Sequence, residues 1–245
     1  MMIDWITDNE RCGLWVPMGM GKTSATLTAI DRLRTAGMLT KPTLVLAPKR
    51  VARDTWPAEI KEWNHLCHLK VSAIIGNQTQ RFLAASVPAE IYTINYENVP
   101  WLIEYWRKRK RWPYGMIVAD ESTKLKSYRT RQGGKRAKEL AKVAFRSRRF
   151  VELTGTPSPN GLLDLWGPTW FVDAGARLGR SYTSYRTRYF IEGYGGYSYT
   201  PREGAKTEIY DKLGDVYLAL KVEDYFDIDK PIEAKRLVKL PPKAR

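Results

Sequence analysis

Two glycines, one residue apart, stand directly before a lysine and a threonine near the amino terminus, as Gly19-Met20-Gly21-Lys22-Thr23. Glycine lets the backbone turn tightly, so successive amides can point at one anion without a Cβ in the way. Lys22 can then reach the β- and γ-phosphates of a nucleotide, and Thr23 can offer its hydroxyl to Mg²⁺. A helix that begins near Thr23 adds the positive end of its dipole. These features predict a phosphate-binding loop made by Met18, Gly19, Met20, Gly21, Lys22, Thr23 and Ser24.

A second element supports this interpretation, although Val16 stands where the usual Gly-x-x-x-x-Gly-Lys-Thr pattern begins with glycine. The apolar run Met116–Ala119 predicts a buried parallel strand, and Asp120-Glu121 follows it directly. Ligands bind at the carboxyl ends of strands in open α/β sheets. We therefore expect Asp120 to hold Mg²⁺ together with Thr23, and Glu121 to orient or deprotonate an attacking water. The predicted catalytic set is Lys22, Asp120 and Glu121, and the predicted chemistry is hydrolysis of a nucleoside triphosphate.

Strand and helix patterns alternate from this loop to about residue 172, which predicts a doubly wound, mostly parallel α/β sandwich of three layers over residues 1–172. The expected strands are Thr43–Ala47, Val71–Ile75, Ile91–Ile94, Met116–Ala119 and Phe150–Leu153. The expected helices lie near Thr23–Thr35, Arg53–Trp63, Thr130–Val143 and Leu162–Phe171.

Residues 173–245 differ in character and form the predicted tyrosine-rich extension. Six tyrosines fall between positions 182 and 199, beside Arg186 and Arg188. Such tyrosines either stack on the bases of a single strand or pack an irregular subdomain onto the core, and the sequence leaves both open. Glu208–Leu220 predicts one more helix, and residues 235–243 predict an edge strand that ends at Pro241-Pro242.

Composition limits the possible classes of protein. The apolar runs are far shorter than the ~20 residues that a membrane span needs, and acidic residues near the amino terminus argue against a secretory signal. Two cysteines suit a reduced, cytoplasmic protein. His65, Cys67 and His68 lie close together in sequence, but adjacent positions rarely face one metal, so a zinc site is disfavoured.

Positive charge is concentrated in one part of the chain. Residues 107–149 hold 16 of the 41 Lys and Arg but only 3 of the 26 Asp and Glu. A solvated face that keeps the protein soluble is one explanation. Nucleic acid is the favoured one, because the charge brackets the predicted hydrolytic carboxylates. We expect this charge and the phosphate-binding loop to share one edge of the sheet.

The ordered motifs resemble those of superfamily-2 helicases, in the Snf-type branch of chromatin remodellers and their phage-encoded relatives. Residues 18–23 resemble motif I, Asp120-Glu121 motif II and Leu153–Pro157 motif III; Pro48 with Trp56 and Glu59 resembles motif Ia, and residues 93–97 motif Ib. The resemblance implies a RecA-like domain that uses ATP and Mg²⁺ and acts on nucleic acid, DNA rather than RNA, in the host cytoplasm if phage-encoded. It also implies nucleic-acid contact or coupling to ATP for Pro48, Lys49, Arg50, Asn95, Tyr96, Lys124, Lys126, Thr154, Gly155 and Thr156.

Two features of that family have no counterpart in the sequence. Its members carry a glutamine upstream of motif I that reads adenine, whereas the first glutamine here is Gln78. They also work with a second RecA-like domain that supplies arginine fingers. We therefore expect the chain to be the first half of a longer motor, to need that second domain in cis or in trans, and to hydrolyse ATP weakly alone. The alternatives are a non-hydrolysing nucleic-acid-binding module with a degenerate ATP site and, less favoured, a small-molecule kinase.

Overall fold

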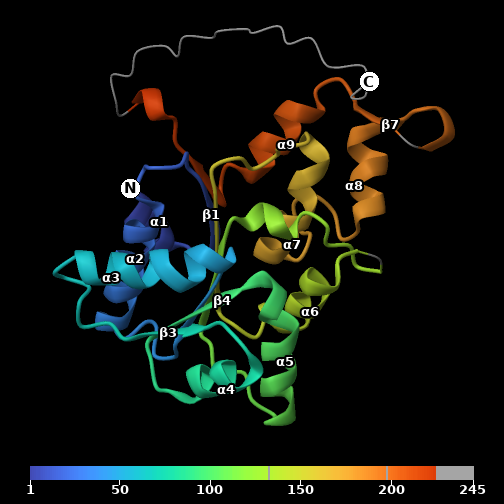
Figure 1. The fold of residues 1–245 in the computed structure, drawn as a ribbon. Coiled ribbons are helices and arrows are strands. Elements are labelled where there is room, and N and C mark those ends of the chain that lie inside the picture. Colours follow the sequence, from blue (N-terminus) through green and yellow to red (C-terminus); the bar gives the residue numbers. More distant parts are fainter. Residues whose placement is uncertain (132, 197, 225–245) are drawn as a thin grey trace, which may run out of the picture.

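The computed structural model describes residues 1–131, 133–196 and 198–224 (Figure 1). A seven-stranded sheet in the order β3-β4-β2-β5-β6-β1-β9 forms its centre, and every neighbouring pair of strands is parallel. Helices cover both faces, which gives the predicted doubly wound three-layer sandwich. The strands are β1 Arg11–Trp15, β2 Thr43–Ala47, β3 Val71–Ile74, β4 Ile91–Asn95, β5 Met116–Asp120, β6 Arg149–Thr154 and β9 Tyr217–Ala219. The helices are α1 Met2–Asp8, α2 Lys22–Thr35, α3 Trp56–Glu62, α4 Gln78–Ser86, α5 Val99–Lys108, α6 Lys135–Ala144, α7 Trp166–Asp173, α8 Tyr182–Tyr189 and α9 Ala205–Leu213.

All five predicted strands are present, and their ends differ from the prediction by at most one residue. The prediction missed β1 and the antiparallel hairpin of β7 Phe190–Glu192 with β8 Tyr199–Pro201. Among the predicted helices, α6 begins at Lys135 instead of Thr130, because Gly133 and Gly134 precede it and Gly133 takes a φ of 124°.

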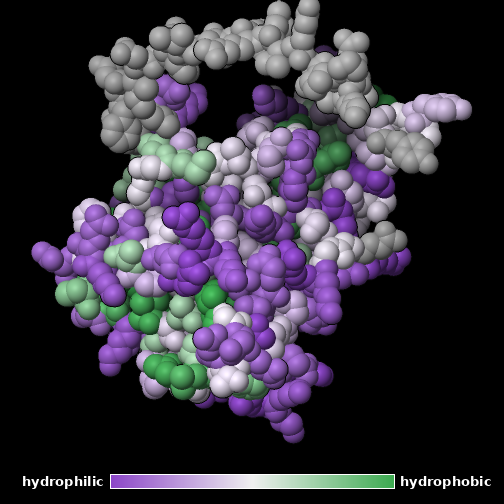
Figure 2. All heavy atoms as spheres, in the orientation of Figure 1, coloured by the Kyte–Doolittle hydropathy of each residue, from purple (hydrophilic) through white to green (hydrophobic). Residues whose placement is uncertain are grey.

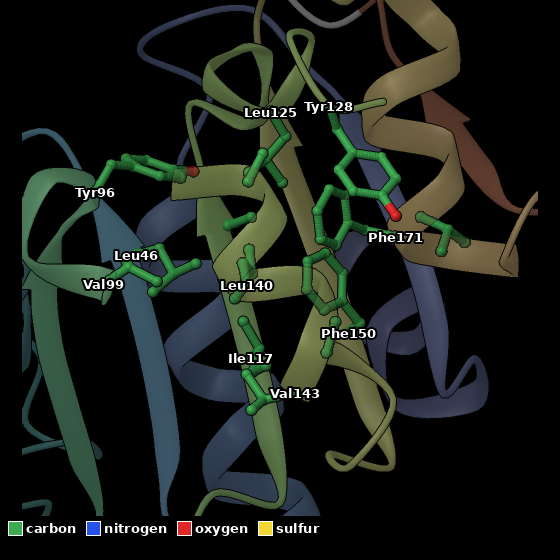
Figure 3. Packing of buried hydrophobic residues seen from close by; sticks show 14 of the residues in the cluster. Leu46, Tyr96, Val99, Ile117, Leu125, Tyr128, Leu140, Val143, Phe150 and Phe171 are labelled. Atoms are coloured by element: carbon green, nitrogen blue, oxygen red, sulfur yellow. The ribbon is translucent and has the colours of Figure 1, made fainter. Parts of the chain in front are cut away.

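Two hydrophobic clusters hold the layers together, one on each face of the sheet. Helices α1, α2 and α3 contribute to one cluster, and α5 to α9 contribute to the other. Strands β2, β4, β5 and β6 are buried at every position, because both of their faces are covered. Figure 3 shows Phe150 of β6 against Phe171 of α7, whose rings stack with centroids 5.7 Å apart. Hydrophilic side chains dominate the outer face in view, with small hydrophobic spots over β3 and α4 (Figure 2).

The predicted helix Glu208–Leu220 is wrong in its second half. Helix α9 ends at Leu213, Gly214 follows, and Tyr217–Ala219 forms β9, which pairs with β1 at the edge of the main sheet. Gly13 makes room for this strand, because a Cβ there would lie 2.2 Å from the Tyr217 ring. The sheet therefore takes strands from both sides of residue 173.

The tyrosines of the extension mostly pack inward. Tyr185 and Tyr189 of α8 are buried, Tyr182 is half-buried and Tyr194 is exposed. This arrangement favours the packing interpretation over base stacking for the buried pair. Tyr197 and the predicted edge strand at 235–243 lie outside the described residues.

A buried carboxyl lies where β9 meets the core. Glu152 of β6 is 1% exposed, its Oε2 accepts a hydrogen bond of 2.8 Å from the Tyr217 hydroxyl, and its Oε1 has no partner among the described residues. Burial raises the pKa of Glu152 from 4.5 to about 8, against smaller lowering effects of Tyr217 and Arg11. The folded protein therefore binds this proton more tightly than the unfolded chain does. The stabilisation that results is complete below pH 4.5 and is lost as the pH rises through about 8.

Glu152→Gln should remove this pH dependence, because the amide resembles the neutral carboxyl at every pH. We expect the variant to melt at least about 3 °C above the wild type at pH 9 and close to it at pH 5. Thermal melts followed by circular dichroism across this range provide the measurement, with exposed Glu203→Gln as the control. Equal melting temperatures at pH 9 would contradict the assigned pKa.

Candidate nucleotide site and nucleic-acid interface

Three loops that the sequence separates widely meet at the carboxyl edge of the sheet. Strands β5, β6 and β1 are consecutive neighbours, with Asp120 opposite Leu153 and Trp15 opposite Thr154. The segment 16–21 follows β1, Glu121 follows β5, and Gly155 follows β6. The parallel register therefore brings the predicted motifs I, II and III to one place.

The loop after β1 has the geometry of an anion cradle. Gly19 and Gly21 take φ values of 81° and 70°, which are left-handed and favour glycine. The Ala25 amide donates to the Gly21 carbonyl at 2.9 Å, so the amides of residues 22–24 precede the first intrahelical bond and remain for a ligand. Val16 is buried and is not among the residues with positive φ, so the position that departs from the usual pattern does not need glycine here.

Lys22 lies folded over its own loop. Its Nζ donates to the carbonyl oxygens of Val16 at 2.6 Å and Pro17 at 2.8 Å. Burial lowers the pKa of Lys22, while the charges of Asp120 and Glu121 act in the opposite direction. A cation held between weak carbonyl partners and two nearby carboxylates suits the negatively charged oxygens of a triphosphate.

Asp120 is a buried carboxylate that two aromatic residues hold in place. Trp56, itself 0% exposed, donates from Nε1 to Asp120 Oδ2 at 3.0 Å. The Tyr96 hydroxyl donates to the Asp120 backbone carbonyl at 2.8 Å. Burial and then the charge of Glu121 raise the pKa of Asp120, while the Trp56 hydrogen bond and Lys22 lower it. Sequence reasoning missed this function of Trp56, because no local pattern joins residues 64 positions apart.

Glu121 has a strained backbone. Its φ and ψ are 57° and 53°, in the left-handed region, directly before the 3₁₀ turn Ser122–Leu125. Such a conformation costs a non-glycine residue about 1–2 kcal/mol, and strain of this kind concentrates at functional sites.

The donor set suits Mg²⁺ better than a metal that needs a cage of protein ligands. The described residues contain no group of three His, Cys, Asp or Glu that could hold a metal ion. Mg²⁺ commonly takes one or two protein oxygens together with substrate phosphates and waters, and Thr23 and Asp120 could supply the protein oxygens. His65 and His68 instead contact Thr28 and Asp31 of α2, each at 2.9 Å.

The loop after β6 lies directly on the phosphate-binding loop. The Val16 amide donates to the Thr154 carbonyl at 3.0 Å. A Cβ on Gly155 would lie 3.5 Å from the Met18 nitrogen, so the two backbones are close. Thr154 is buried and its hydroxyl accepts from the Thr156 amide at 3.1 Å, which fixes the shape of the loop.

Two cavities adjoin the phosphate-binding loop, and the sequence predicted neither. One, of about 410 Å³, lies between residues 18–24 and Glu59, Glu62 and Trp63 at the end of α3. The other, of about 370 Å³, is mostly apolar and is lined by Met2, Ile3, Met20, Ala25 and Leu220, among others. The second cavity could hold a base by packing.

The predicted nucleic-acid residues divide into exposed and buried ones. Lys49, Arg50 and Lys124 are exposed, Pro48 is half-buried, and Lys126 pairs with Asp164 at 3.2 Å. Asn95 and Tyr96 are 5% and 3% exposed, so their side chains offer little surface to a nucleic acid, and their role at the interface stays a prediction. Both hold their neighbours: Asn95 donates to Glu97 at 2.7 Å and Tyr96 to Asp120.

The expectation that all the basic charge shares the edge of the phosphate-binding loop is also wrong. Arg107 and Lys108 end α5, residues 109–111 follow it before β5, and Arg146 and Arg148 precede β6. These residues therefore lie at the amino ends of the strands, opposite Asp120, because α5 and α6 run back across the sheet (Figure 1). Only the residues after β5, from Lys124 to about Arg136, remain near the carboxyl edge.

Comparisons with known proteins agree with this arrangement. The model of the family described as SNF2-related domain matches residues 5–179. Protein p41 of Acyrthosiphon pisum secondary endosymbiont phage 1 is 49% identical over 251 residues, covering 100% of this chain and 54% of that protein. Helicase SWR1 of Mycosarcoma maydis is 31% identical over 160 residues, covering 63% of this chain and 8% of that protein. The chain thus spans about half the length of the phage relative.

Solved structures share the fold. A Sulfolobus solfataricus SWI2/SNF2 ATPase core in complex with dsDNA superposes with a TM-score of 0.66 at 22% identity, covering 89% of this chain and 42% of that one. A structure of the Sulfolobus solfataricus SWI2/SNF2 ATPase core domain superposes with a TM-score of 0.65 at 24% identity, covering 92% of this chain and 42% of that one. None of the described helices is long and apolar enough to cross a membrane.

Trp56→Phe should weaken Mg²⁺-dependent nucleotide binding by about 5- to 30-fold, because Asp120 loses a hydrogen bond worth about 1–2 kcal/mol. The same loss raises the pKa of Asp120 further, so the defect should be larger at pH 6 than at pH 8. Titration of a fluorescent ATP analogue with and without Mg²⁺ measures both effects. Trp101→Phe, on α5, is the control, and an equal defect at both pH values would contradict the positioning role of Trp56.

Proposed function

Since the chain belongs to the SNF2-related domain family, we propose that it is the ATP-binding lobe of a motor that moves along DNA at the expense of ATP hydrolysis. The observation that supports this most is the meeting of three loops at one edge: the left-handed glycine loop with Lys22, the Asp120–Trp56 pair, and the loop at Gly155. A binding loop alone would serve many proteins. The direct backbone contact between the first and third loops is what a motor needs to report its nucleotide state.

In this proposal each residue has a separate task. The amides of residues 19–24 and the Lys22 ammonium bind the phosphates, and Lys22 exchanges its two loop carbonyls for phosphate oxygens. Thr23 and Asp120 hold Mg²⁺, which neutralises charge on the phosphates when bound. Trp56 keeps the Asp120 carboxylate oriented and favours its ionised form. Glu121 orients the attacking water and accepts its proton.

DNA is the proposed track. One similar solved structure is described as a complex with dsDNA, and Lys49, Arg50 and Lys124 are exposed beside the carboxyl edge. The loop after β6 is proposed to couple the phosphate site to these DNA contacts, because it lies against the glycine loop. The residues concerned are Thr154, Gly155 and Thr156. Asn95 and Tyr96 serve the same interface indirectly, by supporting its loops.

A second RecA-like domain, in cis or in trans, is proposed to complete the motor. Arginine fingers from such a partner are worth about 10³–10⁵ in rate, so the chain alone should hydrolyse ATP slowly. The similar SWI2/SNF2 core is more than twice as long as this chain, which supports the proposal.

Similarity to a phage protein supports action in the cytoplasm of an infected host. Residues 1–172 and 173–245 remain proposed as the RecA-like part and its extension.

The main alternative is a nucleic-acid-binding module whose ATP site is degenerate. Val16 and the missing upstream glutamine are its best support in the sequence. Val16 is buried, its φ is not positive and its carbonyl accepts a hydrogen bond from Lys22, which weakens the argument from Val16.

Lys22→Ala should weaken ATP binding at least about tenfold, because a charge-assisted contact to phosphate is lost. Fluorescent ATP titration of the full chain measures this, with exposed Lys41→Ala as the control. Unchanged affinity in Lys22→Ala would favour the degenerate-site alternative.

Glu121→Gln should keep nucleotide affinity and lower turnover about 100-fold or more, because the base is removed while the binding loop is intact. The measurement is steady-state ATP hydrolysis at low salt, with and without DNA, by the chain supplemented with its second domain where the chain alone is too slow. Full turnover in this variant would contradict the assigned role of Glu121.

A further inference from the structure

A strongly basic cavity lies between the segment that follows the 3₁₀ turn Ser122–Leu125 and helix α8, and none of its described lining residues belongs to the glycine loop. Its volume is about 770 Å³, large enough for a ligand of several polar groups. Four arginines and Tyr182 line it, the other lining residues are serine and threonine, and no acidic residue is among them. The arginines of this arginine pocket are Arg129, Arg131, Arg180 and Arg186.

The four charges are not neutralised within the described part of the chain. None of the four arginines has a carboxylate within ion-pair distance among residues 1–131, 133–196 and 198–224. Asp164, whose negative charge acts on Arg129, is itself paired with Lys126 at 3.2 Å. The cavity between α5 and α6 differs, because Glu104 and Glu139 there pair with Arg107 and Lys142.

Two of the arginines, Arg129 and Arg186, are held in place before any ligand arrives. Arg129 lies 3.3 Å from the centroid of the Tyr182 ring and donates to the Lys126 carbonyl at 2.8 Å. Arg186 donates to the Tyr199 hydroxyl at 2.7 Å, and its buried Nε has no partner among the described residues. Converging cations that are already ordered lose little entropy when an anion binds.

Two backbone features complete the pocket. The Gly134 amide donates to the Ser127 carbonyl at 3.2 Å, which closes the segment that presents Arg129 and Arg131. On the other side, Ser181 caps α8, so the positive end of an eight-residue helix adds to the arginine charge. Arg129 lies over one face of the Tyr182 ring, and the other lining groups are arginine, serine and threonine, which suit phosphate better than a base.

We propose that the arginine pocket holds consecutive backbone phosphates of a nucleic-acid strand, at a place separate from the exposed Lys49 and Arg50. Guanidinium groups match phosphate oxygens in a bidentate manner, and several of them in one cavity suit a chain of phosphates better than a single ion. The pocket follows β5 by a short segment. Helix α8, which carries Arg186, also contacts the segment after β6, since the Tyr185 hydroxyl donates to the Leu162 carbonyl at 2.7 Å. This inference rests on the proposed function only for the identity of the polyanion.

The test is binding of labelled single-stranded and duplex DNA by the full chain across a salt series from about 50 to about 200 mM. Arg131→Ala/Arg180→Ala removes two exposed arginines and should leave folding intact. We expect DNA affinity to fall about tenfold or more at low salt, and the slope of log affinity against log salt to fall by about 2. ATP affinity should not change. Arg202→Ala/Lys206→Ala, which removes two exposed cations outside the pocket, should affect the slope by much less.

A second arm separates nucleic acid from a free phosphorylated ligand. Inorganic pyrophosphate is titrated calorimetrically into Lys22→Ala, with and without the two arginine changes. Pyrophosphate binding that depends on the arginines, with an unchanged DNA salt slope, would overturn the nucleic-acid assignment in favour of a small phosphorylated ligand. An unchanged slope without pyrophosphate binding would overturn the pocket as a phosphate site. Absence of DNA binding by the wild type would instead overturn the proposed function as well.

Discussion

The parallel pairing of β6 with both β5 and β1 is the constraint on which the site depends. It sets Asp120 beside Leu153 and Thr154 beside Trp15, so three loops leave the sheet at neighbouring points. A shift of one residue in either pair would turn the core residues of β6 to the other face. Burial of all six residues of β6 therefore fixes the site geometry together with the fold.

Local patterns in the sequence were enough to predict the strands at the centre of the sheet and the glycine loop. Each predicted strand is a short apolar run between turn residues, and such runs are buried on both faces here. The three residues of β9 could not be predicted from the sequence, because they directly follow a strong helix pattern. They can pair with β1 only because Gly13, far away in sequence, has no Cβ that would collide with Tyr217. Trp56 illustrates the same limit, since its hydrogen bond to Asp120 exists only after β2 and β5 have paired.

The distribution of charge shows how far composition can mislead when topology is unknown. Residues 107–149 form one basic block in sequence, but the block crosses the sheet twice, along β5 and back along α6. Its first part lies at the amino ends of the strands, where Glu104 pairs with Arg107 and Lys108. The basic block therefore forms two surfaces on opposite edges of the sheet. Only one of them lies at the same edge as the glycine loop.

The physical link between the arginine pocket and the nucleotide site is short. Lys126, which follows the 3₁₀ turn after Glu121, pairs with Asp164, and Asp164 also accepts from the Asn160 amide at 3.0 Å. Tyr185 of α8 holds the Leu162 carbonyl in the same segment. The loops after β5 and β6 are thus tied to each other and to the helix that carries Arg186. A phosphate chain bound by the arginines would act on both loops at once, because close-packed elements of this kind shift together and not singly. Such an arrangement allows the contacts of the arginines with a nucleic-acid strand and the geometry around Glu121 to change together.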